Sequence, residues 1–209
     1  MKKTYLPYLV PFLVFLVFTY GGAWLPGGPH IYYPIKTLVM AAVLWYYRKA
    51  YTEIRPHFSW LAVAVGIVTF VLWVAPEGLY PHIGSSEFNP YDVDAAWKAY
   101  VLIAFRLAGA AIVVPIFEEL FWRSFAVRWL IKEDFTNVPI GAFTWFSCCV
   151  VILAFGFEHH RWLVGLVAGI LYHALLYYKK DIFECILAHA VTNFLLGIYV
   201  LATQQWSFW

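Results

Sequence analysis

Residues 117–123 read FEELFWR, which places two adjacent glutamates and an arginine inside one of the most apolar stretches of the chain. A charged side chain at membrane depth costs roughly 2.5–3.5 kcal/mol on insertion scales. Three of them within six residues predict a polar cavity inside a membrane protein, and the chemistry of the protein is expected there.

The composition around this stretch is that of a membrane protein. The chain has 209 residues, of which 63% are hydrophobic and 12% charged, whereas a soluble domain has about 25% charged residues. The net charge is +2 and the basic residues form short clusters between apolar runs, so we expect no nucleic-acid partner. The length predicts a single integral membrane domain, residues 1–209.

Seven apolar windows of bilayer length predict an all-α fold, a polytopic transmembrane helical bundle of about seven to eight spans. The windows lie near residues 5–23, 31–47, 58–76, 98–117, 140–158, 162–178 and 182–203. The first is close to ~20 residues, longer than the 7–15 of a secretory signal, and predicts an uncleaved helix. If the spans alternate, most lysines and arginines gather on one side, which predicts a cytoplasmic N-terminus.

The fourth window is predicted to continue as a long helix from about Ala95 to Ile131. Pro115 lies three residues before Glu118 in this helix. A proline frees the carbonyl four residues earlier and kinks the helix. Freed backbone groups at membrane depth are tolerated where they line a cavity, so the proline and the carboxylates indicate the same place.

The first motif is EExxxR, residues 118–123. On a helix Glu119 and Arg123 share a face and can form an ion pair, whereas Glu118 is rotated by about 100° and lacks such a partner. An unpaired glutamate of this kind can take a proton from water that attacks a carbonyl. The alternative is a buried salt-bridge network that locks helix packing.

Two further motifs carry polar side chains at helical spacing. In FxxxH, residues 155–159, His159 is suited to orient the attacking water, to share its proton or to bind a metal, or else it belongs to an interfacial turn. Glu158 and His160 are expected to be loop residues that point elsewhere. In HxxxN, residues 189–193, His189 and Asn193 form a donor pair that can stabilise an oxyanion, or else they bond helix to helix.

The three motifs in this order, each in a different apolar segment, resemble the CPBP intramembrane protease family, which includes the type II CAAX prenyl endopeptidases. The flanking stretches VPIF and ILA match it too, and the similarity covers roughly residues 100–200. The short chain also resembles the CAAX protease-related proteins found alongside bacterial exosortase sorting systems. The resemblance implies an integral membrane protein of the bacterial cytoplasmic membrane.

The resemblance also implies residue roles. Glu118 matches the water-activating glutamate and His159 its partner at the water. Glu119 and Arg123 match the supporting carboxylate and arginine, and His189 and Asn193 match the pair assigned to the oxyanion or to substrate positioning. The preferred interpretation requires no cofactor.

A divalent metal such as zinc is the alternative, with Glu118, His159 and His189 as its ligands, although no HExxH is present. A geometric conflict bears on both versions of the site. A fifth span that starts near Pro139 puts His159 about 30 Å along its helix, whereas His189 lies about 12 Å from the start of the last span. Either the fifth span starts later or tilts, or one segment is broken or re-entrant.

The leading hypothesis is therefore a membrane-embedded peptidase that hydrolyses a peptide bond with a Glu/His-activated water. Its expected partners are membrane lipid and a peptide or membrane-protein substrate, which a lipid modification would suit. One alternative is a non-catalytic membrane scaffold or regulator of the same fold. Another is a transporter or proton relay that uses the same buried ionisable groups.

Overall fold

The structure is a computed structural model that describes residues 4–22, 28–84 and 87–209. Within these ranges the chain is helical and contains no strand, which confirms the all-α prediction. The α-helical segments are α1 (Leu6–Gly21), α2 (Pro29–Tyr47), α3 (Trp60–Val74), α4 (Ala96–Ala108), α5 (Val114–Glu119), α6 (Val127–Ile131), α7 (Trp145–Phe157), α8 (Trp162–Lys179) and α9 (Ile182–Thr203). Short 3-10 turns lie at Arg48–Ala50, Phe135–Asn137 and Trp206–Phe208.

Each apolar window contains helix, but the helices differ in length. Those long and apolar enough to cross a membrane are Ala96–Ile131, Trp162–Lys179 and Ile182–Thr203. The helices Leu6–Gly21, Trp60–Val74 and Trp145–Phe157 are apolar but shorter. In the part of the chain that the structure describes, three helices thus meet the requirements of a full span, and the count of seven to eight stays a prediction.

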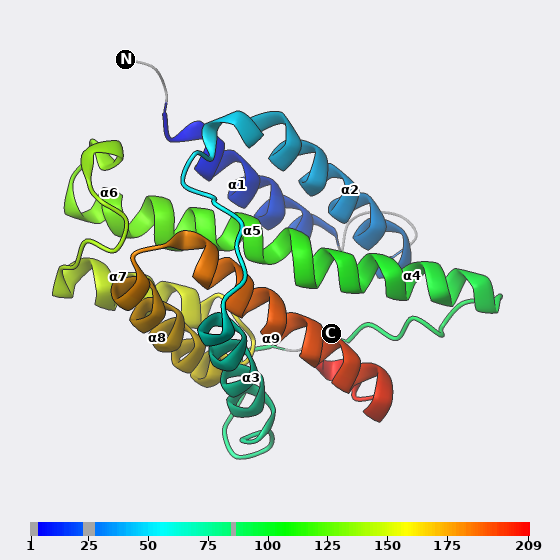
Figure 1. Ribbon diagram of the computed structural model, residues 1–209. Coiled ribbons are helices and arrows are strands. Elements are labelled where there is room, and N and C mark those ends of the chain that lie inside the picture. The colour runs from blue at the N-terminus through cyan, green and yellow to red at the C-terminus, as the bar shows by residue number, and fades with distance from the viewer. Residues whose placement is uncertain (1–3, 23–27, 85–86) are drawn as a thin grey trace.

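A long helical rod, Ala96–Ile131, runs across the molecule and carries α4, α5 and α6 (Figure 1). The hairpin of α1 and α2 packs on one side of this rod, and α9 lies against the other side, with α3, α7 and α8 beyond it. Large apolar side chains such as Val17, Trp60 and Trp145 are exposed on the outer faces of the bundle. Outer faces of this kind suit contact with lipid.

The rod passes Pro115 without ending, because the hydrogen-bond pattern changes just before it. Residues Gly109–Val113 form a π-helical segment, in which the N–H of Val114 donates to the carbonyl of Gly109. The carbonyl of Ala110 thereby loses its usual donor, and the next residue, Pro115, has no N–H. The π segment and the proline together leave one carbonyl of the rod without a backbone partner.

The conflict over the depth of His159 is resolved by where α7 begins. Thr144 caps this helix, since its hydroxyl accepts a hydrogen bond from the N–H of Ser147 at 3.2 Å, and residues 139–143 are not helical. The fifth apolar segment therefore starts later than the predicted residue 140. His159 lies two residues beyond the end of α7, in the turn that leads to α8.

Close helix contacts hold this turn and α9 in place. A Cβ on Gly165 would lie 2.9 Å from the carbonyl oxygen of Gly156, so α7 and α8 touch through backbone on either side of the turn. A Cβ on Gly66 of α3 would lie 2.5 Å from the carbonyl oxygen of Ala188 on α9. Small residues at such crossings let membrane helices approach closely.

Candidate functional site

A buried carboxylate joins two of the three motifs. Oε1 of Glu119 accepts a hydrogen bond from Nη1 of Arg123 at 3.2 Å, as the helical spacing predicts, and it also lies 2.9 Å from Nδ1 of His189. The side chains of Glu119 and Arg123 are fully buried. The first motif on α5 and the last motif on α9 are thus held together by a single oxygen atom.

The phenylalanine of FxxxH connects the middle motif to the same cluster. The guanidinium carbon of Arg123 lies 4.0 Å from the ring centroid of Phe155, a distance typical of cation–π contacts. The carbonyl oxygen of Phe155 lies 2.7 Å from Nδ1 of His159. Phe155 therefore contacts the arginine of one motif with its ring and orients the histidine of its own motif with its backbone.

These contacts determine which ring nitrogens carry a proton. A carbonyl oxygen only accepts hydrogen bonds, so Nδ1 of His159 donates, and in the neutral ring Nε2 keeps a lone pair. The carboxylate of Glu119 also accepts hydrogen bonds, so Nδ1 of His189 donates and the neutral His189 ring has the same tautomer as His159. His189 can donate a hydrogen bond from Nε2 only when the ring is protonated on both nitrogens.

Asn193 satisfies the carbonyl that the π segment leaves open. Its Nδ2 donates to the carbonyl oxygen of Ala110 at 2.8 Å, which ties α9 to the rod just before Pro115. The other N–H of the amide is left for a second partner. His189 and Asn193, expected as a donor pair, are thus anchored to two different places on the rod.

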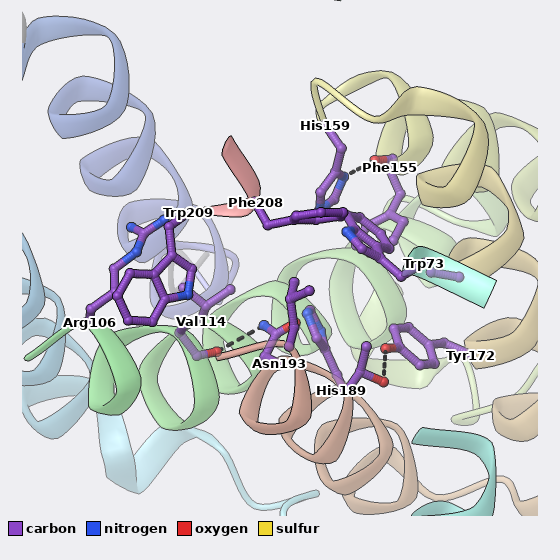
Figure 2. Close-up of a pocket in the computed structure, with 14 residues that line it drawn as sticks. Trp73, Arg106, Val114, Phe155, His159, Tyr172, His189, Asn193, Phe208 and Trp209 are labelled. Carbon is purple, nitrogen blue, oxygen red and sulfur yellow. Dashed lines mark hydrogen bonds between the residues drawn. The ribbon is translucent and has the colours of Figure 1, made fainter. Parts of the chain in front are cut away.

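Glu118, His159, His189 and Asn193 surround two adjoining cavities. The smaller cavity has a volume of about 200 Å³ and is lined by His159, His189 and Asn193. In Figure 2, His159 points into it from the α7–α8 turn, while His189 and Asn193 approach from α9 on the opposite side. The larger cavity, of about 530 Å³, is lined by Glu118, His159 and Asn193.

Glu118 differs from its neighbour Glu119 in having no polar partner. Its side chain is 3% exposed, and its Oε2 is buried without a hydrogen-bond partner. Among the described residues it makes no ion pair, in contrast to Glu119. The two vicinal carboxylates therefore have the distinct environments that the helical rotation predicts.

Glu158 is the site residue that the sequence interpretation missed. It lies in a turn as expected, but it lines the larger cavity together with Glu118 rather than pointing elsewhere. Nε1 of Trp122 donates to its Oε2 at 3.1 Å, and its Oε1 is buried without a hydrogen-bond partner. His160 also lines this cavity, with Nδ1 2.6 Å from the carbonyl oxygen of Ile83. The position of Glu158 directly before His159 in the sequence was the signal that could have identified Glu158 as a site residue.

The predicted metal ligands do not form a cluster. Throughout residues 4–22, 28–84 and 87–209, no group of three His, Cys, Asp or Glu side chains is close enough to hold a metal ion. Glu118 and His159 share the larger cavity, whereas His189 lines the smaller one. The arrangement does not fit a three-ligand site of Glu118, His159 and His189, and the metal alternative stays a prediction.

Residues 96–195 match the model of the family described as type II CAAX prenyl endopeptidase Rce1-like. The matched region begins at the start of α4 and includes all three motifs. No curated protein and no solved structure matches the chain.

Proposed function

We propose that this protein is an intramembrane endopeptidase with a Glu118- and His159-activated water, because residues 96–195 match the type II CAAX prenyl endopeptidase Rce1-like family, a family of peptidases. One observation carries this proposal: the unpaired, buried carboxylate of Glu118 and the imidazole of His159 line the same cavity. The family match and the long apolar helices indicate that the protein is an integral membrane protein.

The first step uses the two acceptors on the cavity wall. A water molecule held between Glu118 and Nε2 of His159 attacks the peptide carbonyl carbon, and Glu118 takes one of its protons. Glu118 makes no ion pair with any residue in the described part of the chain, so its carboxylate is free to accept that proton. Glu118 then returns the proton to the amide nitrogen, which leaves as an amine, so that the elements of water are added across the bond.

The negative oxygen formed during the attack needs donors. We assign this role to His189 and Asn193, because an N–H of Asn193 remains available and His189 can donate from Nε2 as an imidazolium. Oε1 of Glu119 holds Nδ1 of His189 at 2.9 Å, and Nη1 of Arg123 donates to the same oxygen atom, so both residues fix the orientation of the imidazole. Glu119 and Arg123 are thus positioning residues on this proposal.

The remaining expectations concern substrate and membrane. We propose a peptide or membrane-protein substrate, for which a lipid modification would suit a site within a bilayer. We further propose the bacterial cytoplasmic membrane with the N-terminus in the cytoplasm, on the distribution of basic residues alone.

The experiment compares membrane protein fragments by mass spectrometry between cells that carry the wild type and cells that carry Glu118→Ala, each with and without a chelator. Fragments are expected to disappear in Glu118→Ala and in His159→Ala, but not in Glu133→Ala, which changes an exposed glutamate of the same region. Identical fragments in wild type and Glu118→Ala would overturn the proposed mechanism. Loss of fragments with the chelator alone would favour the metal version.

A further inference from the structure

One part of the smaller cavity is not shared with the larger one. His159 and Asn193 line both cavities, whereas Glu118 lines the larger and His189 the smaller. A peptide carbonyl that reaches all four side chains therefore lies where the two cavities meet. We call the part of the smaller cavity beyond this junction the inner pocket; among the described residues it is lined by Phe155, Ala168, Tyr172, His189, Thr192 and Leu196.

The polar groups of the inner pocket bond to partners within the chain. The hydroxyl of Tyr172 donates to Oγ1 of Thr192 at 2.9 Å, and Thr192 donates in turn to the carbonyl oxygen of Ala188 at 3.0 Å. His189 is bonded through Nδ1 to Glu119 and is assigned to the oxyanion. A charged side chain placed among these residues would lose its water without gaining an ion-pair partner, so the pocket favours an apolar one.

Charged side chains line other parts of the cavity walls. Arg106 lines both cavities, and in Figure 2 it lies beside Trp209, at the opposite end of the site from Tyr172. In the described part of the chain, the other charged residues on these walls line the larger cavity: Lys36, Glu118, Glu158 and Arg161. The inner pocket is therefore the apolar end of the site.

The volume of the smaller cavity matches one large apolar side chain. The whole cavity has a volume of about 200 Å³. An apolar cavity of about 150 Å³ in a protein core holds a benzene molecule, so the smaller cavity accommodates at most about eight carbon atoms at the same space per atom. The side chain of leucine, methionine or phenylalanine is within this limit, whereas that of tryptophan and a long acyl chain exceed it.

Aromatic rings and one small side chain shape the inner pocket. The rings of Phe155 and Tyr172 lie edge to face, with centroids 6.4 Å apart, and both side chains are buried. Such walls offer ring faces and edges to a further ring. Ala168, buried on α8, is the smallest residue of the lining, whereas Leu196 of α9 is one of the larger. A longer side chain at position 168 would shorten the pocket, and a shorter one at position 196 would enlarge it.

We propose that the inner pocket binds an apolar side chain of the substrate, no larger than phenylalanine, from a residue directly beside the bond that is cut. This inference rests on the proposed function, because the junction of the two cavities is the place of the scissile carbonyl. Ala168 and Leu196 then determine which side chains are accepted. One methylene more or less in an apolar pocket changes selection about 10- to 200-fold, so a misfit is readily detected.

The test is affinity selection with the purified full-length Glu118→Gln variant, which on this mechanism binds peptides without cutting them. The probe is a random synthetic peptide library, and the retained peptides are sequenced by mass spectrometry. Leucine, methionine and phenylalanine should be enriched at one position by about tenfold or more over alanine, whereas tryptophan, glutamate and lysine should not. Digestion of the same peptides by the wild type should place the cut beside that position.

Two variants change the pocket in opposite directions in the Glu118→Gln background. Ala168→Leu should retain phenylalanine peptides about tenfold less and keep those with valine. Leu196→Ala should gain tryptophan peptides, and it alone remains decisive if Ala168→Leu does not fold. The matched control is Ala154→Leu, which enlarges an exposed alanine of α7 and should leave the selection unchanged. Each variant must elute from size exclusion like its parent.

Equal retention of apolar and charged peptides by the parent would overturn the inference, as would enrichment of glutamate, which would indicate a carboxylate bound at Arg106. A selection that neither Ala168→Leu nor Leu196→Ala alters would overturn it too. If the wild type cuts peptides without regard to the flanking residue, the inference fails and the proposed function stands. If apolar peptides are selected with the expected response to both variants but none is ever cut, the pocket binds a side chain and the proposed function fails.

Discussion

Replacing Arg123 by glutamine removes the ion-pair partner of the buried Glu119, and we expect this single change to destabilise the protein strongly. The pair has an exposed fraction of 0% on both sides, at a distance of 3.2 Å. Removing one partner of such a pair costs about 3–5 kcal/mol, because the other charge stays buried without its cation; in this protein only the contact with Nδ1 of His189 would remain to Glu119. The lost contact with the Phe155 ring, at 4.0 Å, adds up to about 2 kcal/mol.

The assay is thermal unfolding in detergent, followed by near-ultraviolet circular dichroism. A chain of this size loses about 2–4 °C of melting temperature per kcal/mol, so a total loss of about 3–7 kcal/mol lowers it by roughly 6–28 °C. The double variant Glu119→Gln with Arg123→Gln should recover part of this loss, because it leaves no buried charge unpaired. A double variant as unstable as Arg123→Gln alone would refute the reasoning. Lys98→Gln, at an exposed ion pair, should leave the melting temperature unchanged.

Two further outcomes are expected in the same assay. Asn193→Leu keeps the volume of the side chain but leaves the carbonyl of Ala110 without a donor, so it should cost about 1–3 kcal/mol, and an unchanged melting temperature would contradict this role. The hydrogen bonds from Arg161 lower the pKa of Glu77 below its usual 4.5. Because the folded-state pKa is depressed, this stabilisation is present above about pH 4.5 and is lost as the pH falls further. Glu77→Gln should therefore flatten the decline in melting temperature on the acid side, and an identical decline would count against the contact.

The sequence predicts those parts of the site that depend on a single helix. The spacing of Glu119 and Arg123 is sufficient for their ion pair, because residues four apart share a helix face. The continuous helix past Pro115 was also expected, since the apolar pattern runs through it. In both cases the relevant geometry is local and is fixed by the helical repeat.

The contacts between helices could not be obtained in the same way. The bond between His189 and Glu119 joins residues far apart in the chain, and it depends on how α9 packs against the rod. Glu158 resembled an ordinary turn residue because its place on the cavity wall depends on where α7 ends and how Trp122 is oriented. The start of α7 was placed too early because hydrophobicity continues through residues 139–143 although helix does not.

The π-helical segment makes Pro115 and Asn193 a coupled pair, although they lie on different helices. An ordinary residue at position 115 would supply an N–H, and the rod could return to regular α-helical bonding with Val114 donating to Ala110. The amide of Asn193 would then lose its structural partner on the rod, and only its proposed role at the oxyanion would remain. A redesign that replaces Pro115 therefore has to provide a new partner for the amide of Asn193.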